Sequence, residues 1–306
     1  MSFLKRVLGQ DKPFWEKMFN PSELSTFYDA VEEYLESQGH TLEIKNGYAI
    51  LQSGKAKIDL RNIAQDCRQT EEGHWRVIIE NYFRQIESIR ENAFSVGDKP
   101  FAEVADLLAV RLWPNGTLQN VGAGNLIYRE DLEGTISTLV LNLPDSIQAV
   151  TPQMATSWEK SKDELFNIGF DNVFAHCKPD IAETVLAGDI KTVTLSNNND
   201  FLTATHVFFI EKYPNCIGKY GSLVGIPLRD IVVCYPINDN QIARAIQVLV
   251  PTIKDVYVEG PGSVSPYVYW YHEDCFEAVH YVEKKNEFVL PNQLLDILKS
   301  SMETKN

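Results

Sequence analysis

The stretch FLTATHVFFIEKYPNCIGKYGSLVGIPLRDIVVCYPIND, residues 201–239, is the most apolar block of the chain, and it decides the expected fold class. Residues 222–228 and 230–236 are short and rich in Val and Ile, which predicts two consecutive strands. Their near-continuous apolar character indicates a sheet that is buried on both faces. Residues 206–213 are expected to be helical, and the spacing of apolar residues predicts another helix over residues 241–250. The block therefore contributes two strands followed by a helix.

The first third of the chain predicts a helix, a three-strand meander and a long second helix. Residues 21–37 form the first helix, with Ser22 as its N-cap, and an apolar stripe predicts the second helix over residues 74–91. Between them the segments TLEIK, YAILQ and AKIDL predict strands, and Asn46-Gly47 is a strong hairpin signal. These elements together predict an αβββα unit.

A polar break at residues 95–100, which contains Gly97 and Pro100, gives the expected domain boundary. The αβββα unit then occupies residues 1–96, and a larger domain occupies residues 97–306. Strand and helix signals alternate irregularly in the larger domain, which predicts an α+β fold and not a doubly wound sheet. The further strands are expected at residues 108–113, 125–129, 135–143, 181–195, 256–259, 267–271 and 276–282, and the further helices at residues 101–107, 151–153, 161–175 and 291–300.

Charge excludes several classes of partner. The formal net charge is −14, and residues 101–200 hold 6 Lys and Arg against 14 Asp and Glu, a difference of −8. Nucleic-acid binding needs clustered Lys and Arg to displace counterions, and the sequence has no such cluster. We therefore expect no nucleic-acid and no membrane partner. An acidic middle segment is typical of a solvated surface, and it also suits a docking face for a basic protein.

Cysteine usage and the N-terminal segment predict a cytoplasmic protein. The five cysteines contain no CxxC pair, so neither a disulfide framework nor a structural zinc site is indicated. The start, MSFLKRVLGQDKPFW, lacks the apolar core of a signal peptide, and no apolar run is long enough to span a membrane. The glycines of Val121-Gly-Ala-Gly124 do not join a strand to a helix, so no dinucleotide cofactor is expected.

Three segments resemble the YtpQ-like family of bacterial proteins of unknown function. They are the helix, Asn-Gly meander and long helix of residues 22–90, the segment VTPQMATSWEKSKDELFNIGFDNV at residues 150–173, and GSLVGIPLRDIVVCYPIND at residues 221–239. The resemblance covers most of the chain and contains no catalytic signature. It implies a cytoplasmic α+β protein whose biochemical role is not established, and it assigns no functional residues.

Candidate partner-binding residues come from the acidic middle third and from the junction of the two central strands. Arg229 and Asp230 at that junction form either a local ion pair that fixes the turn or an exposed recognition pair. The complete set is Glu130, Asp131, Glu133, Asp163, Glu164, Arg229 and Asp230. These residues predict a protein interface and no metal site.

The densest group of reactive side chains is His272-Glu273-Asp274-Cys275, between two expected strands. His272, Asp274 and Cys275 are the alternative catalytic residues. Neighbouring residues in a strand point to opposite faces, so His272 can act with Asp274, or Glu273 with Cys275; a polar hairpin turn is the structural alternative. Thiol–imidazole pairs are also conceivable for Cys216 with His206 and for Cys234 with His272, although Cys234 is typical of a buried core residue.

Two functional hypotheses follow. The first is a non-enzymatic binding protein that uses its acidic surface to engage a basic protein, one specific form being a bacterial immunity protein that neutralises a toxin. The second is a hydrolase or transferase with a thiol or a carboxylate–histidine pair near residues 272–275. A structural role inside a larger assembly is a weaker third hypothesis. The sequence favours the first.

Overall fold

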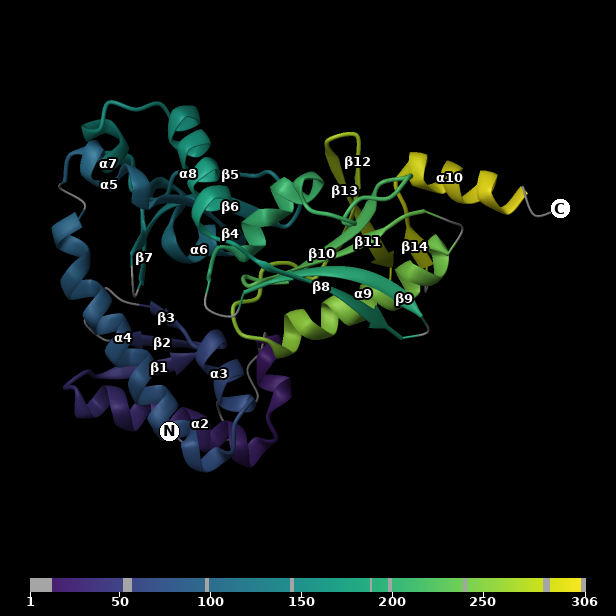
Figure 1. The fold of residues 1–306 in the computed structure, drawn as a ribbon. Coiled ribbons are helices and arrows are strands. Elements are labelled where there is room, and N and C mark those ends of the chain that lie inside the picture. The colour runs from purple at the N-terminus through teal and green to yellow at the C-terminus, as the bar shows by residue number, and fades with distance from the viewer. Residues whose placement is uncertain are drawn as a thin grey trace. The chain divides into compact units, whose positions relative to one another are not determined.

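The computed structural model describes residues 13–51, 57–96, 99–143, 146–187, 189–197, 200–238, 241–282 and 287–303 (Figure 1). The chain divides into two compact units, one of residues 1–94 with 258–261 and one of residues 95–257 with 262–306. The division of the chain into domains at residues 96 and 97 stays a prediction.

The first unit has the expected order of helix, meander and helix. Its three-stranded antiparallel sheet has the order β1-β2-β3, with Ile44 opposite Ala49. The connection between the second and third predicted strands, residues 53–55, lies outside the described residues. The elements of this unit are η1 (Phe14–Met18), α2 (Pro21–Ser37), β1 (Leu42–Lys45), β2 (Tyr48–Leu51), β3 (Lys57–Asp59), α3 (Arg61–Arg68), η2 (Glu72–His74) and α4 (Trp75–Val96).

Helix α2 has the predicted bounds of residues 21–37, but its N-cap differs from the predicted one. Its N-cap is Asn20 and not Ser22, because the Asn20 Oδ1 accepts from the backbone N–H groups of Ser22 and Glu23, both at 2.9 Å. The Glu23 carboxylate in turn accepts from the Asn20 N–H at 2.9 Å, which completes a capping box. Pro21 then stands at the first helical position, where its missing N–H costs nothing.

One hydrophobic core holds the first unit together. It draws on η1, α2, the meander, α3 and α4, and its described buried members run from Trp15 to Phe83. Trp15 and Phe27 pack edge to face at 5.9 Å, and Tyr34 stacks on Phe83 at 5.5 Å. Trp75, Ile79 and Phe83 bury the first half of the stripe predicted on α4. The stripe from Ile86 onward lies outside the described side chains.

The second unit is built around a seven-stranded sheet of order β14-β13-β12-β10-β11-β9-β8, in which every pairing is antiparallel. Its central strands are those of the opening stretch: β10 pairs with β11, with Val224 opposite Cys234. The strands are β8 (Asp180–Leu186), β9 (Ile190–Ser196), β10 (Ser222–Leu228), β11 (Ile231–Pro236), β12 (Val268–His272), β13 (Cys275–Val282) and β14 (Glu287–Val289).

Both faces of this sheet are covered, as the continuous apolar strands predict. Val224 and Val232 face the 3-10 helix η5 (Thr203–Lys212), which contributes Val207 and Ile210. Leu223 and Val233 face α9 (Ile242–Glu259) and α10 (Asn292–Glu303), and α9 runs along one face of the sheet in Figure 1. The aromatic run of β12 is core on both sides, since Tyr269 and Trp270 are each 1% exposed.

A smaller four-stranded sheet belongs to the same unit. Strand β6 pairs with β4, β5 and β7, and α8 packs on the sheet through a close approach of Gly169 to Ala109 and Val110. The expected helix start at Thr151-Pro152 is present, and Thr151 caps it. The elements are α5 (Phe101–Val104), η3 (Ala105–Leu107), β4 (Leu108–Pro114), α6 (Thr117–Val121), η4 (Ala123–Asn125), β5 (Tyr128–Arg129), β6 (Thr135–Leu143), β7 (Ser146–Ala149), α7 (Pro152–Ser157) and α8 (Lys162–His176).

One of the strand predictions is wrong. Residues 256–259 are the end of α9 and not a strand, because the helix continues through Pro251 and buries Ile253. The helix predicted at residues 206–213 is present as the end of the 3-10 helix η5. The sequence patterns did not predict helices α3 and α6 or strands β7 and β14.

The fold class is mixed α+β with antiparallel sheets, which confirms the prediction. In the described part of the chain, no helix combines the length and the apolar character that crossing a membrane requires.

Candidate functional site

The acidic candidates of the middle third lie at two elements that an ion pair joins. Glu130, Asp131 and Glu133 follow β5, while Asp163 lies in the first turn of α8. The Arg129 Nη2 lies 2.5 Å from the Asp163 Oδ1. The Arg129 Cζ also lies 4.2 Å from the centre of the Phe166 ring, a cation–π contact that fixes the guanidinium over α8. The pair therefore connects two segments more than thirty positions apart in the chain.

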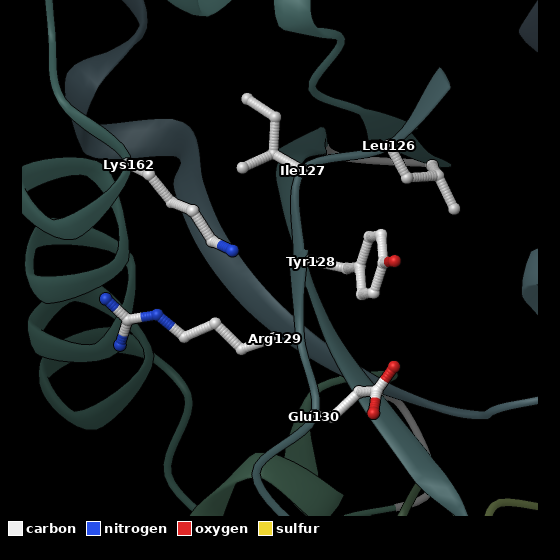
Figure 2. A pocket seen from close by; sticks show the side chains of 6 residues that line it. All are labelled: Leu126, Ile127, Tyr128, Arg129, Glu130 and Lys162. Carbon is white, nitrogen blue, oxygen red and sulfur yellow. The ribbon is translucent and has the colours of Figure 1, made fainter. Parts of the chain in front are cut away.

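A hollow of about 440 Å³ lies at this junction and opens to solvent. Figure 2 shows its wall: Arg129 extends from β5 toward α8, and Tyr128 and Glu130 point to the other side of the strand. Lys162 enters from the start of α8, and its Nζ lies 5.9 Å from the centre of the Tyr128 ring. The lining residues are Leu126, Ile127, Tyr128, Arg129, Glu130 and Lys162. The hollow thus combines an apolar wall with charges of both signs.

Glu164 is part of the capping box at the start of α8 and also contributes a carboxylate to the surface. The Ser161 Oγ accepts from the Glu164 N–H at 3.2 Å, and the Glu164 carboxylate accepts from the Ser161 N–H and hydroxyl, both at 2.9 Å. These hydrogen bonds, together with Lys160, lower the pKa of Glu164. Glu164 is therefore held in its charged form at the start of α8, where the helix dipole favours a carboxylate.

Glu133 lies farther along the β5–β6 connection. Its Oε1 is 3.4 Å from the His280 Nε2 on β13. The Glu133 carbonyl also accepts a hydrogen bond of 2.7 Å from the Tyr269 hydroxyl of β12. These two contacts fix this end of the acidic segment against the large sheet.

Arg229 and Asp230 lie apart from these elements, in the tight turn between β10 and β11. The Arg229 N–H donates to the Gly262 carbonyl at 2.9 Å, and the Arg229 Cζ lies 4.1 Å from the centre of the Phe201 ring. Burial raises the pKa of Asp230, while the charge of Arg229 lowers it. The two residues attract each other, and both also belong to the packing of the turn.

The alternative catalytic residues sit on the β12–β13 hairpin. His272 and Cys275 are register partners on either side of a turn whose residues, Glu273 and Asp274, have positive φ angles of 48° and 60°. The His272 ring stacks on Trp270 at 4.8 Å, and Asp274 accepts a hydrogen bond of 3.1 Å from the Tyr271 hydroxyl. This is the geometry of a polar two-residue hairpin turn with an exposed cysteine.

The other thiol–imidazole pairings have different partners in the structure. The His206 Nδ1 lies 2.5 Å from the Tyr213 hydroxyl, and burial lowers the pKa of His206 to about 4. Cys216 and Cys234 are buried and hydrogen-bond each other, and this bond together with burial raises the pKa of Cys234. Cys234, a buried thiol of raised pKa, is therefore a poor nucleophile. Among the described residues, no group of His, Cys, Asp and Glu has the arrangement of a metal site.

Sequence reasoning missed the two cations of the hollow, Arg129 and Lys162. A signal for them exists, because each stands directly beside an acidic candidate, Glu130 and Asp163. Mixed charge at that spacing predicts ion pairing and not a purely acidic face.

Comparison of the sequence with family models, with curated proteins and with solved structures finds no match. The resemblance to the YtpQ-like family therefore stays a prediction, and the function rests on the geometry.

Proposed function

We propose that the chain is a non-enzymatic binding protein that engages a basic protein partner through the acidic segments beside β5 and α8. The observation that supports this best is the Arg129–Asp163 ion pair at 2.5 Å, since it joins the two acidic segments at one hollow. Glu130 lines that hollow, Asp131 is exposed beside it, and the side chain of Asp163 is 84% exposed.

The local charge favours a cationic partner. The carboxylates of Glu130, Asp131, Glu133, Asp163 and Glu164 outnumber the cations of Arg129, Lys160 and Lys162 in the same segments. Arg129 is already paired with Asp163 and stacked on Phe166. A net charge of −14 adds a long-range field that accelerates encounter with a basic protein.

One specific form of this proposal is an immunity protein that neutralises a basic toxin in a bacterial cytoplasm. Inhibitors of basic enzymes use acidic surfaces because electrostatic steering raises their association rate. The same acidic surface would also suit basic proteins other than toxins. The first point to test is therefore whether the partner is a basic protein.

The test is affinity purification of the tagged full chain from its native cells, with mass spectrometry of the proteins that stay bound at moderate salt. We expect one stoichiometric partner with a basic isoelectric point, released as salt rises, because exposed charges are screened within about 10 Å at 0.1 M salt. The double variant Glu130→Lys/Asp131→Lys should lower the association rate about tenfold at low salt.

The matched control is Glu43→Lys/Asp255→Lys, which makes the same change of net charge at exposed positions on β1 and α9. Equal loss of binding in both double variants would mean that only the overall charge matters. Binding that neither salt nor the first variant weakens would refute the acidic interface.

The alternative is a hydrolase or transferase with His272, Asp274 and Cys275. The cross-strand pairing of His272 with Cys275 favours it, because it brings an imidazole and an exposed thiol to the same hairpin end. A clean monomer with no partner in the purification would shift the weight to this reading, and Cys275→Ser would then be the variant to compare.

A further inference from the structure

Arg111 is a buried cation in the middle of an apolar strand. It lies between Val110 and Leu112 of β4 and is only 7% exposed. Its Nε is buried and has no hydrogen-bond partner. Within the part of the chain that the structure describes, no carboxylate forms an ion pair with Arg111. A buried charge without an ion-pair partner destabilises the folded state, so a functional role for Arg111 would explain its presence.

The Arg111 guanidinium packs against an aromatic ring and has no ion-pair partner among the described residues. Its Cζ lies 3.6 Å from the centre of the Trp113 ring, a cation–π contact that offsets part of its charge. The Trp113 Nε1–H donates to the Thr138 hydroxyl at 2.9 Å, which fixes the indole on the neighbouring strand β6. Burial and the charge of Arg229 lower the pKa of Arg111 to about 9, so the side chain stays charged at neutral pH.

A second guanidinium, that of Arg229, contacts the same aromatic ring, Phe201, as Arg111 does. The Cζ atoms of Arg111 and Arg229 lie 5.7 Å and 4.1 Å from the centre of the Phe201 ring, so they are at most 9.8 Å apart, the sum of the two distances. Phe201 is 37% exposed and connects this cluster to the surface. Like charges at this range repel, and an anion between them would lower that repulsion.

The fold holds Arg229 in this position. Gly262 has a φ of +76°, and a Cβ there would lie 2.6 Å from the Arg229 Cδ and 2.8 Å from its Nε. The Ala204 N–H donates to the Arg229 carbonyl at 2.8 Å, which ties the turn to the segment that carries Phe201. Asp230 attracts Arg229 from the same turn, so Arg229 is partly compensated and Arg111 is the stronger anchor.

We propose that Arg111 and Arg229, with Phe201 as an apolar wall, bind the oxyanion of a small molecule, either a phosphate or a carboxylate. The planar fork of a guanidinium matches both groups through paired N–H donors, at about 2.8 Å from nitrogen to oxygen. An anion at this position compensates the buried charge of Arg111 and removes the repulsion between the two cations. The site lies on β4 and the β10–β11 turn, and it is independent of the protein-binding hollow beside β5.

The test is thermal unfolding of the full chain in a titration with inorganic phosphate and, separately, with acetate, each against chloride at constant ionic strength. We expect a saturable rise of the unfolding temperature by a few degrees with one of the two anions, because a ligand that binds only the folded state stabilises it. The stronger response identifies the ligand as a phosphate or as a carboxylate.

Arg111→Met should abolish the anion-dependent rise while leaving the unfolding temperature in chloride unchanged or higher, since it removes a buried unpaired charge. Arg111→Lys keeps the charge without the fork and should lose most of the rise. The matched control Arg244→Met removes an exposed arginine that pairs with Asp189, and it should respond to the anion as the unaltered chain does.

Two results would overturn the site. One is the same stabilisation by phosphate and acetate as by chloride in the unaltered chain. The other is an undiminished rise in the Arg111→Met variant or, if that variant does not fold, in Arg229→Met. A fall in the unfolding temperature of Arg111→Met without any anion response in the unaltered chain would assign Arg111 a purely structural role on Trp113.

Discussion

His206 is a buried imidazole whose environment opposes protonation. Burial is the main cause that lowers its pKa to about 4 from the ordinary value of 6.5, and the nearby charge of Lys178 acts in the same direction, while Asp200 opposes it. A group with a lowered pKa in the folded state contributes its full stability above pH 6.5 and loses it as the pH falls toward 4. The free energy of unfolding should therefore fall by about 2–3 kcal/mol over this range because of His206.

Urea unfolding at pH 7.5 and 4.5 measures this effect. The variant His206→Gln keeps a hydrogen-bonding partner for the Tyr213 hydroxyl and should lose about 2 kcal/mol less between the two pH values than the unaltered chain. His176→Gln, at an exposed position in the last turn of α8, is the matched control. An equal pH dependence of His206→Gln and the unaltered chain would contradict the buried, neutral state of His206.

The sequence predicts some residues of the candidate sites but not others. Exposed carboxylates such as Glu130 and Asp163 are recognisable from local charge alone. The role of Arg111 is not, because only Trp113 is a near neighbour, two positions along the same strand, while Phe201 and Arg229 come from distant segments of the chain. The one local signal is that Arg111 is the single charged residue in the apolar segment LAVRLW. A strand of that composition is expected to be buried on both faces, so its arginine is expected to be buried as well.

At the scale of elements, the strands of the opening stretch are well predicted because several signals agree. Their apolar runs, their β-branched residues and the turn at residues 228–231 all indicate a hairpin. The end of α9 is mispredicted because Pro251 and the β-branched residues after it oppose a helix locally. Packing of Ile253 against the sheet outweighs that local preference.

The contact between α9 and the sheet depends on Gly225. A Cβ at this position would lie 2.3 Å from the Ile253 Cδ1 and 2.5 Å from its Cγ1. Gly225→Ala should therefore destabilise the protein by about 1–3 kcal/mol through overpacking. Ile253→Ala alone should cost about 2–5 kcal/mol because it leaves a cavity. The double variant should cost at least about 1 kcal/mol less than the sum, since the new methyl group then occupies vacated space.

Chemical denaturation of the four members of this cycle gives the coupling free energy. Gly73→Ala is the control for the general effect of replacing glycine, because a Cβ at Gly73 meets no atom within 4 Å. That variant should be neutral or slightly stabilising. Strict additivity of Gly225→Ala and Ile253→Ala would mean that α9 moves away from the sheet instead of resisting the added methyl group.

At the scale of the whole molecule, the first unit contains a complete core of its own. Among the described residues, its buried apolar cluster runs from Trp15 to Phe83 and includes residues of the helices on both sides of the meander. Chains of about 50–200 residues with one closed core are of domain size. The net charge of residues 1–96 is also small compared with the whole chain, so charge repulsion does not oppose folding of this part.

We expect a fragment of residues 1–96 to fold without the rest of the chain, which tests the boundary that the sequence suggests. Circular dichroism should show a cooperative thermal transition, and two-state unfolding in urea should have the slope of a domain of this size. The control is a fragment that ends at Gln69, which lacks Trp75, Ile79 and Phe83 and should unfold without cooperativity. If the longer fragment also melts gradually and binds a dye for exposed apolar surface, the αβββα unit needs the remainder of the chain, and its closed core is insufficient for stability.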